Sequence, residues 1–187
     1  MGLLTIIKKQ KRKDKEIRVL TLGLDNAGKT TIIKRMLRQD NSLIAPTMGF
    51  EINTLVYGDH MLNIWDIGGQ TTLRAFWGNY FDKTDVVIWV VDGLSIERLD
   101  ESFKELYEKI ILQQDRLMGL YLCIVVNKID LIDGEAERQK VGKEVEKVLG
   151  LDDSNKIDSD HWCITLVSGK TGEGIDNVLD WIVTRDY

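Results

Sequence analysis

The chain has 187 residues, of which 43% are hydrophobic and 29% charged, and its formal net charge is −5. This length and apolar content suffice for one domain with a sizeable core. The charge is uneven, because residues 1–15 hold six basic residues and one acidic residue, a balance of +5, so residues 16–187 carry −10. An acidic body excludes nucleic acid as an expected partner, since phosphate contacts need a basic face. No run approaches the ~18 apolar residues of a membrane-spanning helix.

The N-terminal segment MGLLTIIKKQKRKDK, residues 1–15, combines an apolar patch with a basic run. The patch is shorter than the ~7–15 apolar residues of a signal-peptide core, and the charges follow it instead of preceding it. Three interpretations remain open: a solvated tail, an amphipathic helix that docks on a surface, or a partner-binding arm. We predict an amphipathic, basic N-terminal helix over residues 1–15 and one globular domain over residues 16–187.

Five short apolar runs rich in β-branched residues recur along the chain and predict buried strands. They are residues 17–23, 61–66, 86–92, 121–127 and 162–167. Helix-like stretches lie between most of them, at residues 28–39, 95–114, 135–149 and 174–185. Continuous apolar strands that alternate with amphipathic helices predict a parallel sheet covered on both faces.

Residues 51–66 differ, because two strand-like runs meet at Gly58 and Asp59, a pair typical of a tight hairpin turn. The hairpin adds one antiparallel strand. The sequence therefore predicts a single doubly wound α/β domain with a mostly parallel six-stranded sheet and helices on both faces. In such a sheet, ligands bind beyond the carboxyl ends of the strands, so chemical motifs are expected directly after the apolar runs.

The first motif, GLDNAGKT at residues 23–30, fits the phosphate-binding pattern G-x-x-x-x-G-K-[ST] and lies between a strand and a helix. Backbone N–H groups of such a loop converge on phosphate oxygens. Lys29 would reach the β- and γ-phosphates, and Thr30 would offer its hydroxyl to Mg²⁺. The nucleotide-binding residues expected here are Gly23, Leu24, Asp25, Asn26, Ala27, Gly28, Lys29, Thr30 and Thr31.

The second motif, DIGGQ at residues 66–70, begins at the last residue of the apolar run 61–66. Asp66 is expected near Thr30, where it would hold magnesium through water, and Gly69 would approach the γ-phosphate. Gln70 is the expected catalytic residue, because it can orient the attacking water. Thr47, in the segment APTMGF, is expected to join Thr30 on Mg²⁺ and to meet the γ-phosphate, so that triphosphate orders its loop.

The third motif, NKID at residues 127–130, predicts a preference for guanine. The Asp130 carboxylate would accept hydrogen bonds from N1–H and the N2 amine of guanine, a donor pattern that adenine lacks. Asn127 would brace the pocket, and the stem of Lys128 would lie over the purine ring. A buried hydrogen-bonding site of this kind rejects the wrong base, because its polar groups would stay unpaired.

The segment SGKTGEG follows the last apolar run and is expected to complete the base pocket. Ser168 and the backbone N–H groups of Gly169 and Lys170 would lie near the guanine O6. Each motif alone could be an ordinary turn at a strand end. Together they predict a GTP- and GDP-binding site with Mg²⁺ as cofactor.

These motifs resemble those of the Ras-type superfamily of small GTPases over the whole chain. Within it, WDIGGQ, the preceding PTMGF and the Met-Gly N-terminal segment resemble the Arf and Arf-like branch. More narrowly, MGLLTIIKKQK, GLDNAGKTTI, NYFDKTD and HWCI resemble Arf-like GTPases that act with tubulin-folding cofactors. The resemblance implies tubulin-folding cofactors, and tubulin itself, as partners. It also implies slow GTP hydrolysis that depends on a GTPase-activating protein.

The resemblance implies a mechanism as well. In the GDP form the N-terminal helix would pack on the body, and GTP would slide the hairpin of residues 51–66 in register and expel the helix. A two-residue slide keeps the same face buried, because strand side chains alternate with period two. Phe50, Trp65 and Tyr80 match the exposed aromatic effector patch of the family, although each could also be a core residue.

Some positions depart from the family pattern. Gly169 stands where relatives usually carry alanine, and residue 6 is Ile6 where the myristoylation pattern M-G-x-x-x-[ST] needs Ser or Thr. The chain ends in TRDY, which excludes a prenylated C-terminal cysteine. Cys123 and Cys163 lie inside apolar runs, which favours buried thiols in a reducing compartment. We therefore expect an unlipidated cytoplasmic protein with weak or no membrane contact and some association with the cytoskeleton.

The sequence is compatible with three functions. The first is a GTP-controlled switch that regulates tubulin folding and microtubule biogenesis through tubulin cofactors. The second is an Arf-type GTPase of membrane traffic that is recruited through its N-terminal helix. The third is a P-loop nucleotide kinase, against which the NKID motif and the absence of an arginine-rich lid insertion count.

Overall fold

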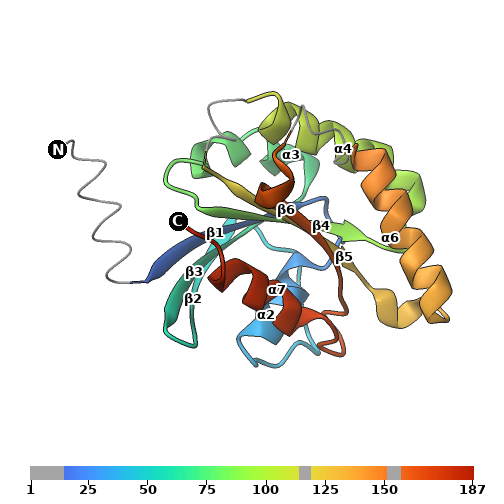
Figure 1. Cartoon of the computed structure of the whole chain (residues 1–187), viewed down its shortest axis with the longest axis horizontal. Coiled ribbons are helices and arrows are strands. Elements are labelled where there is room, and N and C mark those ends of the chain that lie inside the picture. Colours follow the sequence, from blue (N-terminus) through green and yellow to red (C-terminus); the bar gives the residue numbers. More distant parts are fainter. Residues whose placement is uncertain (1–14, 114–118, 151–156) are drawn as a thin grey trace.

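The computed structural model describes residues 15–113, 119–150 and 157–187. Six strands form one sheet in the order β2-β3-β1-β4-β5-β6 (Figure 1). The strands are β1 (Glu16–Gly23), β2 (Phe50–Tyr57), β3 (His60–Ile67), β4 (Val86–Asp92), β5 (Tyr121–Asn127) and β6 (Trp162–Leu166). Only the β2–β3 pair is antiparallel, and the other four strand pairs are parallel. The predicted fold class is confirmed.

Helices cover both faces of the sheet, as Figure 1 shows. They are α2 (Lys29–Met36), α3 (Thr71–Arg74), α4 (Leu99–Leu106), α6 (Glu135–Leu149) and α7 (Ile175–Val183). Five single turns join them: η1 (Trp77–Tyr80), η2 (Ile96–Arg98), η3 (Tyr107–Ile111), η4 (Ile129–Leu131) and η5 (Ser159–His161). Alternate residues of each buried strand face opposite layers, which is why the strand sequences are apolar throughout.

The core has two halves, one on each face of the sheet. One half packs α4 and α6 against strand residues such as Leu20 and Trp89, and the other packs α2 and α7 against residues such as Val19 and Val90. Within the first half the rings of Trp77 and Trp89 meet edge to face at 5.6 Å. This two-sided core holds the carboxyl ends of β1, β3, β4 and β5 at one edge of the sheet.

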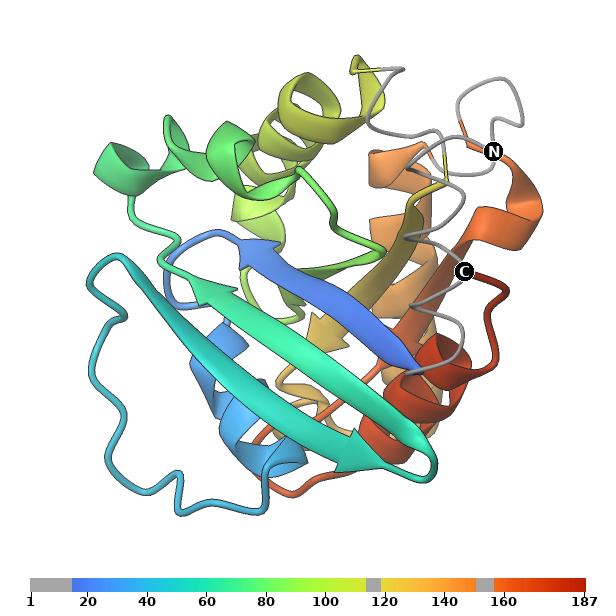
Figure 2. The same ribbon diagram turned by 90° about the vertical axis from the view of Figure 1, so that its left-hand side faces the viewer.

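The hairpin forms where the sequence predicts it. β2 and β3 pair from Phe50 opposite Ile67 to Tyr57 opposite His60, and Gly58 in the turn has a φ of 58°. Figure 2 shows the two strands as a long ribbon along the outer side of the sheet, beside β1. A left-handed φ is accessible to glycine at no steric cost, so Gly58 favours this tight turn.

The long helix predicted over residues 95–114 is divided in the structure. Its regular part is α4, preceded by the turn η2 and continued by the wider π-type turn η3. The adjacent residues Ile110 and Ile111 of this turn are both buried in the core, with exposed fractions of 0% and 6%.

Three further expectations concern the N-terminal segment, the cysteines and membrane-spanning helices. The predicted N-terminal helix of residues 1–15 lies outside the described residues, apart from Lys15. Cys123 is a buried free thiol as predicted, whereas Cys163 is partly exposed because β6 is an edge strand. No helix in the described part of the chain is long and apolar enough to span a membrane.

Candidate nucleotide-binding site

The turn between β1 and α2 has a conformation that only glycine accommodates at two positions. Gly23 has a φ of 142° and Gly28 a φ of 94°. A Cβ at Gly23 would overlap the carbonyl oxygen of Val90, and one at Gly28 would overlap the Asn127 amide. The motif glycines therefore let the phosphate loop pass between two neighbouring strand ends.

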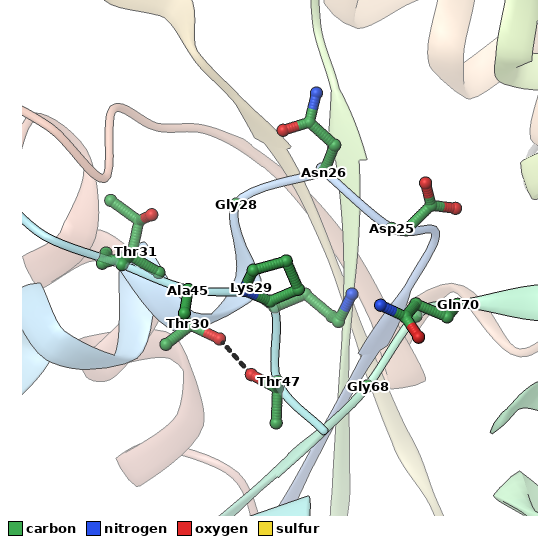
Figure 3. Close-up of a pocket in the computed structure, with 13 residues that line it drawn as sticks. Asp25, Asn26, Gly28, Lys29, Thr30, Thr31, Ala45, Thr47, Gly68 and Gln70 are labelled. Carbon is green, nitrogen blue, oxygen red and sulfur yellow. Dashed lines mark hydrogen bonds between the residues drawn. The ribbon is translucent and has the colours of Figure 1, made fainter. Parts of the chain in front are cut away.

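A cavity of about 340 Å³ opens at this turn, at the carboxyl edge of the sheet. Three chain segments line it, as Figure 3 shows. They contribute Asp25, Asn26, Gly28, Lys29, Thr30 and Thr31, then Ile44, Ala45, Pro46 and Thr47, and finally Gly68, Gly69 and Gln70. Most residues predicted for phosphate and magnesium thus line one space, with the predicted catalytic Gln70 at its wall, whereas Gly23, Leu24, Ala27 and Asp66 are not part of the lining.

Lys29 is buried at the floor of this cavity, with an exposed fraction of 6%. Its amino group donates to the carbonyl oxygens of Gly23 at 3.0 Å and Leu24 at 2.9 Å. Burial lowers the pKa of Lys29 to about 8, although the carboxylates of Asp66 and Asp25 favour its charged form. A bound phosphate would further favour the ammonium, because it places an opposite charge beside it.

Three oxygen-bearing side chains meet beside Lys29. The Thr30 hydroxyl lies 2.7 Å from the Thr47 hydroxyl and 2.6 Å from Asp66 Oδ2, and Thr47 Oγ1 lies 3.4 Å from the same carboxylate oxygen. Asp66 is only 1% exposed, and burial raises its pKa. Its other oxygen, Oδ1, is buried and has no hydrogen-bond partner among the described residues.

This donor set suits a magnesium ion. Mg²⁺ prefers oxygen ligands and is usually bound by one or two protein groups, several waters and the phosphates of its substrate. Two hydroxyls and a buried carboxylate with one unsatisfied oxygen provide such a set. A divalent cation would also offset the cost of burying the Asp66 charge.

The loop of residues 68–70 lies close against the phosphate loop. A Cβ at Gly69 would come within 2.5 Å of the Gly23 carbonyl oxygen and would overlap the Lys29 amino group. Gly69 therefore lets this loop lie against the phosphate loop, and its approach to the γ-phosphate stays a prediction. Gln70 follows, and its side chain extends beside Lys29 in Figure 3.

The base-binding residues form a connected group. Asn127 is 2% exposed, donates from Nδ2 to the Ala27 carbonyl at 2.9 Å and accepts from the Gly169 N–H at 2.9 Å. The Ser168 hydroxyl donates to Asp130 Oδ1 at 2.7 Å. Asn127 thus links the phosphate loop to the base loop, the bracing position that the sequence predicts for it.

Comparison with known proteins identifies the family. The model of the ADP-ribosylation factor family matches residues 3–185. The chain belongs to the ADP-ribosylation factor family. It is therefore a small GTPase that binds guanine nucleotides and hydrolyses GTP, and the predicted Arf-like resemblance is confirmed.

Relatives of this Arf-like GTPase align over nearly the whole chain. ADP-ribosylation factor-like protein 2 of Arabidopsis thaliana is 47% identical over 183 residues, covering 98% of this chain and 94% of that protein. The Dictyostelium discoideum protein of the same name is 45% identical with the same coverage. The solved structure of the Arl6 (BBS3) small GTPase of Trypanosoma brucei with bound GppNp has a TM-score of 0.74 and 26% identity, covering 89% of this chain and 95% of that one.

Two supports of the base pocket in this Arf-like GTPase escaped the sequence prediction. Asp92, at the end of β4, accepts from Lys128 Nζ at 2.6 Å. Arg35, in the last turn of α2, donates to the Gly169 carbonyl at 3.1 Å and to the Lys170 carbonyl. Asp92 could have been identified from the sequence, because it is the last residue of the apolar run 86–92 and functional residues are expected at the ends of such runs. No residue near Arg35 in the sequence indicates its role, because its partners Gly169 and Lys170 lie far along the chain.

Gly169 proves more constrained than its position in the motif indicates. A Cβ there would lie 3.2 Å from two atoms of Ile32 and one of Thr31 on α2. An alanine at this position would therefore press on α2 unless the helix moves by a few tenths of an ångström. The Gly169 backbone N–H nevertheless lies in the base pocket, bonded to Asn127.

The three predicted effector residues form one aromatic cluster. Ring centroids lie 5.6 Å apart for Phe50 and Trp65, 5.7 Å for Phe50 and Tyr80, and 5.9 Å for Trp65 and Tyr80. Phe50 is 47% exposed, whereas Trp65 and Tyr80 are partly buried and pack against the core. The cluster therefore combines a surface ring with two rings that anchor it.

Proposed function

We propose that this Arf-like GTPase is a magnesium-dependent switch whose GTP-bound form binds tubulin-folding cofactors. The observation that carries the proposal is the 2.7 Å contact between Thr30 and Thr47. Thr30 begins the helix that follows the phosphate loop, while Thr47 lies three residues before Phe50 of the aromatic cluster. A ligand that holds Thr47 would thereby set the position of a proposed partner-binding surface.

Each part of the cavity has a role in this proposal. Thr30 and Thr47 would hold the magnesium ion directly, and Asp66 would hold it through water. When bound, the ion would neutralise the charge that develops on the β- and γ-phosphate oxygens. Lys29 binds those phosphates at the cavity floor. Gln70 orients a water molecule for attack on the γ-phosphate.

The base pocket supplies guanine selectivity in the proposal. Asp130 accepts from the two guanine donors while Ser168 holds one of its oxygens in place. Lys128 is held by Asp92 with its stem available to cover the purine ring. Within the described residues every arginine near the cavity is engaged by carboxylates or carbonyls of the chain itself. Rapid hydrolysis would therefore require a GTPase-activating protein, which in relatives of this plan is worth ~10³–10⁵ in rate.

The choice of partner rests on the sequence. The segments MGLLTIIKKQK, GLDNAGKTTI, NYFDKTD and HWCI resemble Arf-like GTPases of the tubulin-cofactor pathway. Full-length identity of 43–47% to factor-like 2 proteins of three organisms supports placement in one subgroup. We further propose a cytoplasmic protein with a fraction at the cytoskeleton.

The test is a binding assay with purified tubulin-folding cofactors. The protein is loaded with GppNp or GDP in the presence of magnesium, and each cofactor is titrated by light scattering or calorimetry. We expect at least tenfold tighter binding to the GppNp form and loss of that difference in Phe50→Ala. Met48→Ala is the matched control, because Met48 is 81% exposed in the same loop and outside the aromatic cluster.

Two outcomes would contradict the proposal. Equal binding of both nucleotide forms to the cofactors would exclude the switch. Failure of every cofactor to bind, together with retention of the GppNp form on floated liposomes, would favour the membrane-traffic alternative.

A further inference from the structure

Five charged side chains form a ring beside the nucleotide cavity, and the nucleotide motifs do not explain it. Asp25 of the phosphate loop accepts from Arg98 at 2.9 Å and from Arg74 at 3.1 Å. Arg98 also bonds Glu101 at 3.0 Å, and Arg74 bonds Glu101 at 2.7 Å and Glu105 at 3.3 Å. We call this set the Asp25 ring. It joins the phosphate loop, α3, η2 and α4.

Asp25 places a negative charge at the cavity wall. It lines the cavity, and its side chain is 45% exposed. Figure 3 shows it on the same side of the cavity as Gln70, close to Lys29. A free carboxylate at this wall would repel the terminal phosphate of a bound triphosphate, because like charges at a partly exposed site interact over several ångströms.

Arg98 contacts both the side chain and the backbone of Asp25. Its Nη2 donates to the Asp25 carboxylate, and its Nη1 donates to the Asp25 backbone carbonyl at 3.0 Å. The hydrogen bond from Arg98 is the main cause that lowers the pKa of Asp25. The planar guanidinium fork fixes both the orientation of the carboxylate and the path of the loop, which a lysine ammonium does not reproduce.

Arg74 extends the ring to the loop of residues 68–70. Its side chain is only 5% exposed, and its Nε donates to the Gly69 carbonyl at 2.9 Å. Two glutamates and one aspartate share its charge, so Arg74 alone does not neutralise Asp25. Arg98 is therefore the principal counter-charge of the carboxylate at the cavity wall.

We propose that Arg98 is a specificity-determining residue that favours triphosphate over diphosphate in this site. It fixes the Asp25 carboxylate by a hydrogen bond and offsets its negative charge at the wall that would face the γ-phosphate. GDP has no γ-phosphate, so its affinity should be insensitive to the orientation of Asp25. The inference rests on the proposed function only in taking this cavity as the phosphate site.

The decisive experiment is a double-mutant cycle on nucleotide affinity. Dissociation constants for fluorescent GppNp and GDP are measured with magnesium for the wild type, Arg98→Ala, Asp25→Asn and the double variant. We expect Arg98→Ala to weaken GppNp about tenfold and GDP less than twofold. Asp25→Asn removes the charge, so adding Arg98→Ala to it should change the GppNp-to-GDP ratio less than twofold.

Two further variants test the role of the fork. Arg98→Lys keeps the charge without the paired contacts, so its GppNp affinity should lie between those of wild type and Arg98→Ala. Arg185→Ala is the matched control, because Arg185 is partly buried and bonds Trp181 and Thr184 at the C-terminus. Its nucleotide ratio should equal that of the wild type. Melting temperatures confirm that each variant is folded.

Two results would overturn the inference. They are an unchanged GppNp-to-GDP ratio in Arg98→Ala, whether or not both affinities weaken, and a ratio that falls equally with or without the Asp25 charge. Each of them leaves guanine-nucleotide binding by the wild type intact. Failure of the wild type to bind either nucleotide with magnesium would instead refute the proposed function.

Discussion

The base half and the phosphate half of the nucleotide site are built differently. In the base half, Asn127, Asp130 and Lys128 each have a hydrogen-bond or ion-pair partner within the chain. In the phosphate half, Lys29 is buried beside the buried Asp66, whose Oδ1 lacks a partner among the described residues. The base half is therefore held by contacts within the chain, whereas the phosphate half keeps one buried carboxylate oxygen that a ligand would satisfy.

This contrast suits a switch. In the proposed function, a pre-formed base pocket would hold guanine nucleotide in both states, because it is indifferent to the number of phosphates. The phosphate half, with its unsatisfied Asp66 oxygen, would respond to the γ-phosphate and its cation. The difference between GTP and GDP would then be expressed at Thr47, three residues before Phe50 of the aromatic cluster.

The largest expected effect is on the base half. Asp130→Asn replaces two acceptor oxygens by an amide, so guanine loses a matched partner and the affinity for GTP should fall by about 10⁴-fold. A xanthine nucleotide, whose C2 carbonyl can accept from the new amide, should bind better than GTP. Competition binding measures both, and a variant that still prefers guanine would contradict the assignment of Asp130.

The next largest expected effect is on GTP hydrolysis in the phosphate half. Gln70→Leu removes the group that orients the attacking water, so GTP hydrolysis with an activating partner should fall by about 10³-fold. GTP affinity should change less than threefold, because Gln70 is not part of the base pocket. Single-turnover assays give the rate, and unchanged hydrolysis would exclude Gln70 as the catalytic residue.

A third prediction compares the two halves directly in nucleotide-free protein. Asn127→Ala leaves the Ala27 carbonyl and the Gly169 N–H without their buried partner, so the free energy of unfolding should fall by about 2 kcal/mol. Thr47→Ala, at a partly exposed loop position, should change it by less than about 0.5 kcal/mol. Urea denaturation measures both, and equal losses would show that the halves do not differ in pre-organisation.

The smallest effect concerns Asp66 without ligand. Burial raises its pKa, so ionisation of Asp66 costs stability, and the cost appears as pH rises through the folded-state pKa. Asp66→Asn should therefore stabilise the nucleotide-free protein at pH 7 by about 1 kcal/mol.

This gain should vanish as pH falls toward the ordinary carboxyl value of 3.8, where Asp66 is protonated in both states. Denaturation at several pH values gives the dependence. With magnesium and GTP the same variant should bind more weakly than the wild type. A destabilised nucleotide-free variant would show that the Asp66 carboxylate is already satisfied by the chain.

Prediction from sequence succeeded where the signal is local. β5 and α6 occupy the predicted residues 121–127 and 135–149, because an unbroken apolar run and a regular polar-apolar period each have one compatible structure. The phosphate-loop glycines were identified for the same reason, since their backbone angles exclude other residues. α3 was missed, because four residues are too few to show a helical period.

The supports of the site were missed for a different reason. Arg98 lies 73 residues from Asp25, and Arg35 lies 134 residues from Gly169. Each arginine occupies an ordinary position on a surface helix or turn, and nothing nearby distinguishes it from a solvated charge. Its role exists only once the strand order brings two distant loops together.

The sequence by itself determined the strands, most helices, the guanine and phosphate motifs and the family, because each depends on residues within about ten positions of one another. Only the tertiary structure decided that Thr47 meets Thr30, that Asp66 keeps an unpaired oxygen, and that Arg98 clamps Asp25. β1 lies between β3 and β4, so three loops converge at one edge of the sheet. Contacts between those loops follow from the order of the strands, which no local pattern of side chains records.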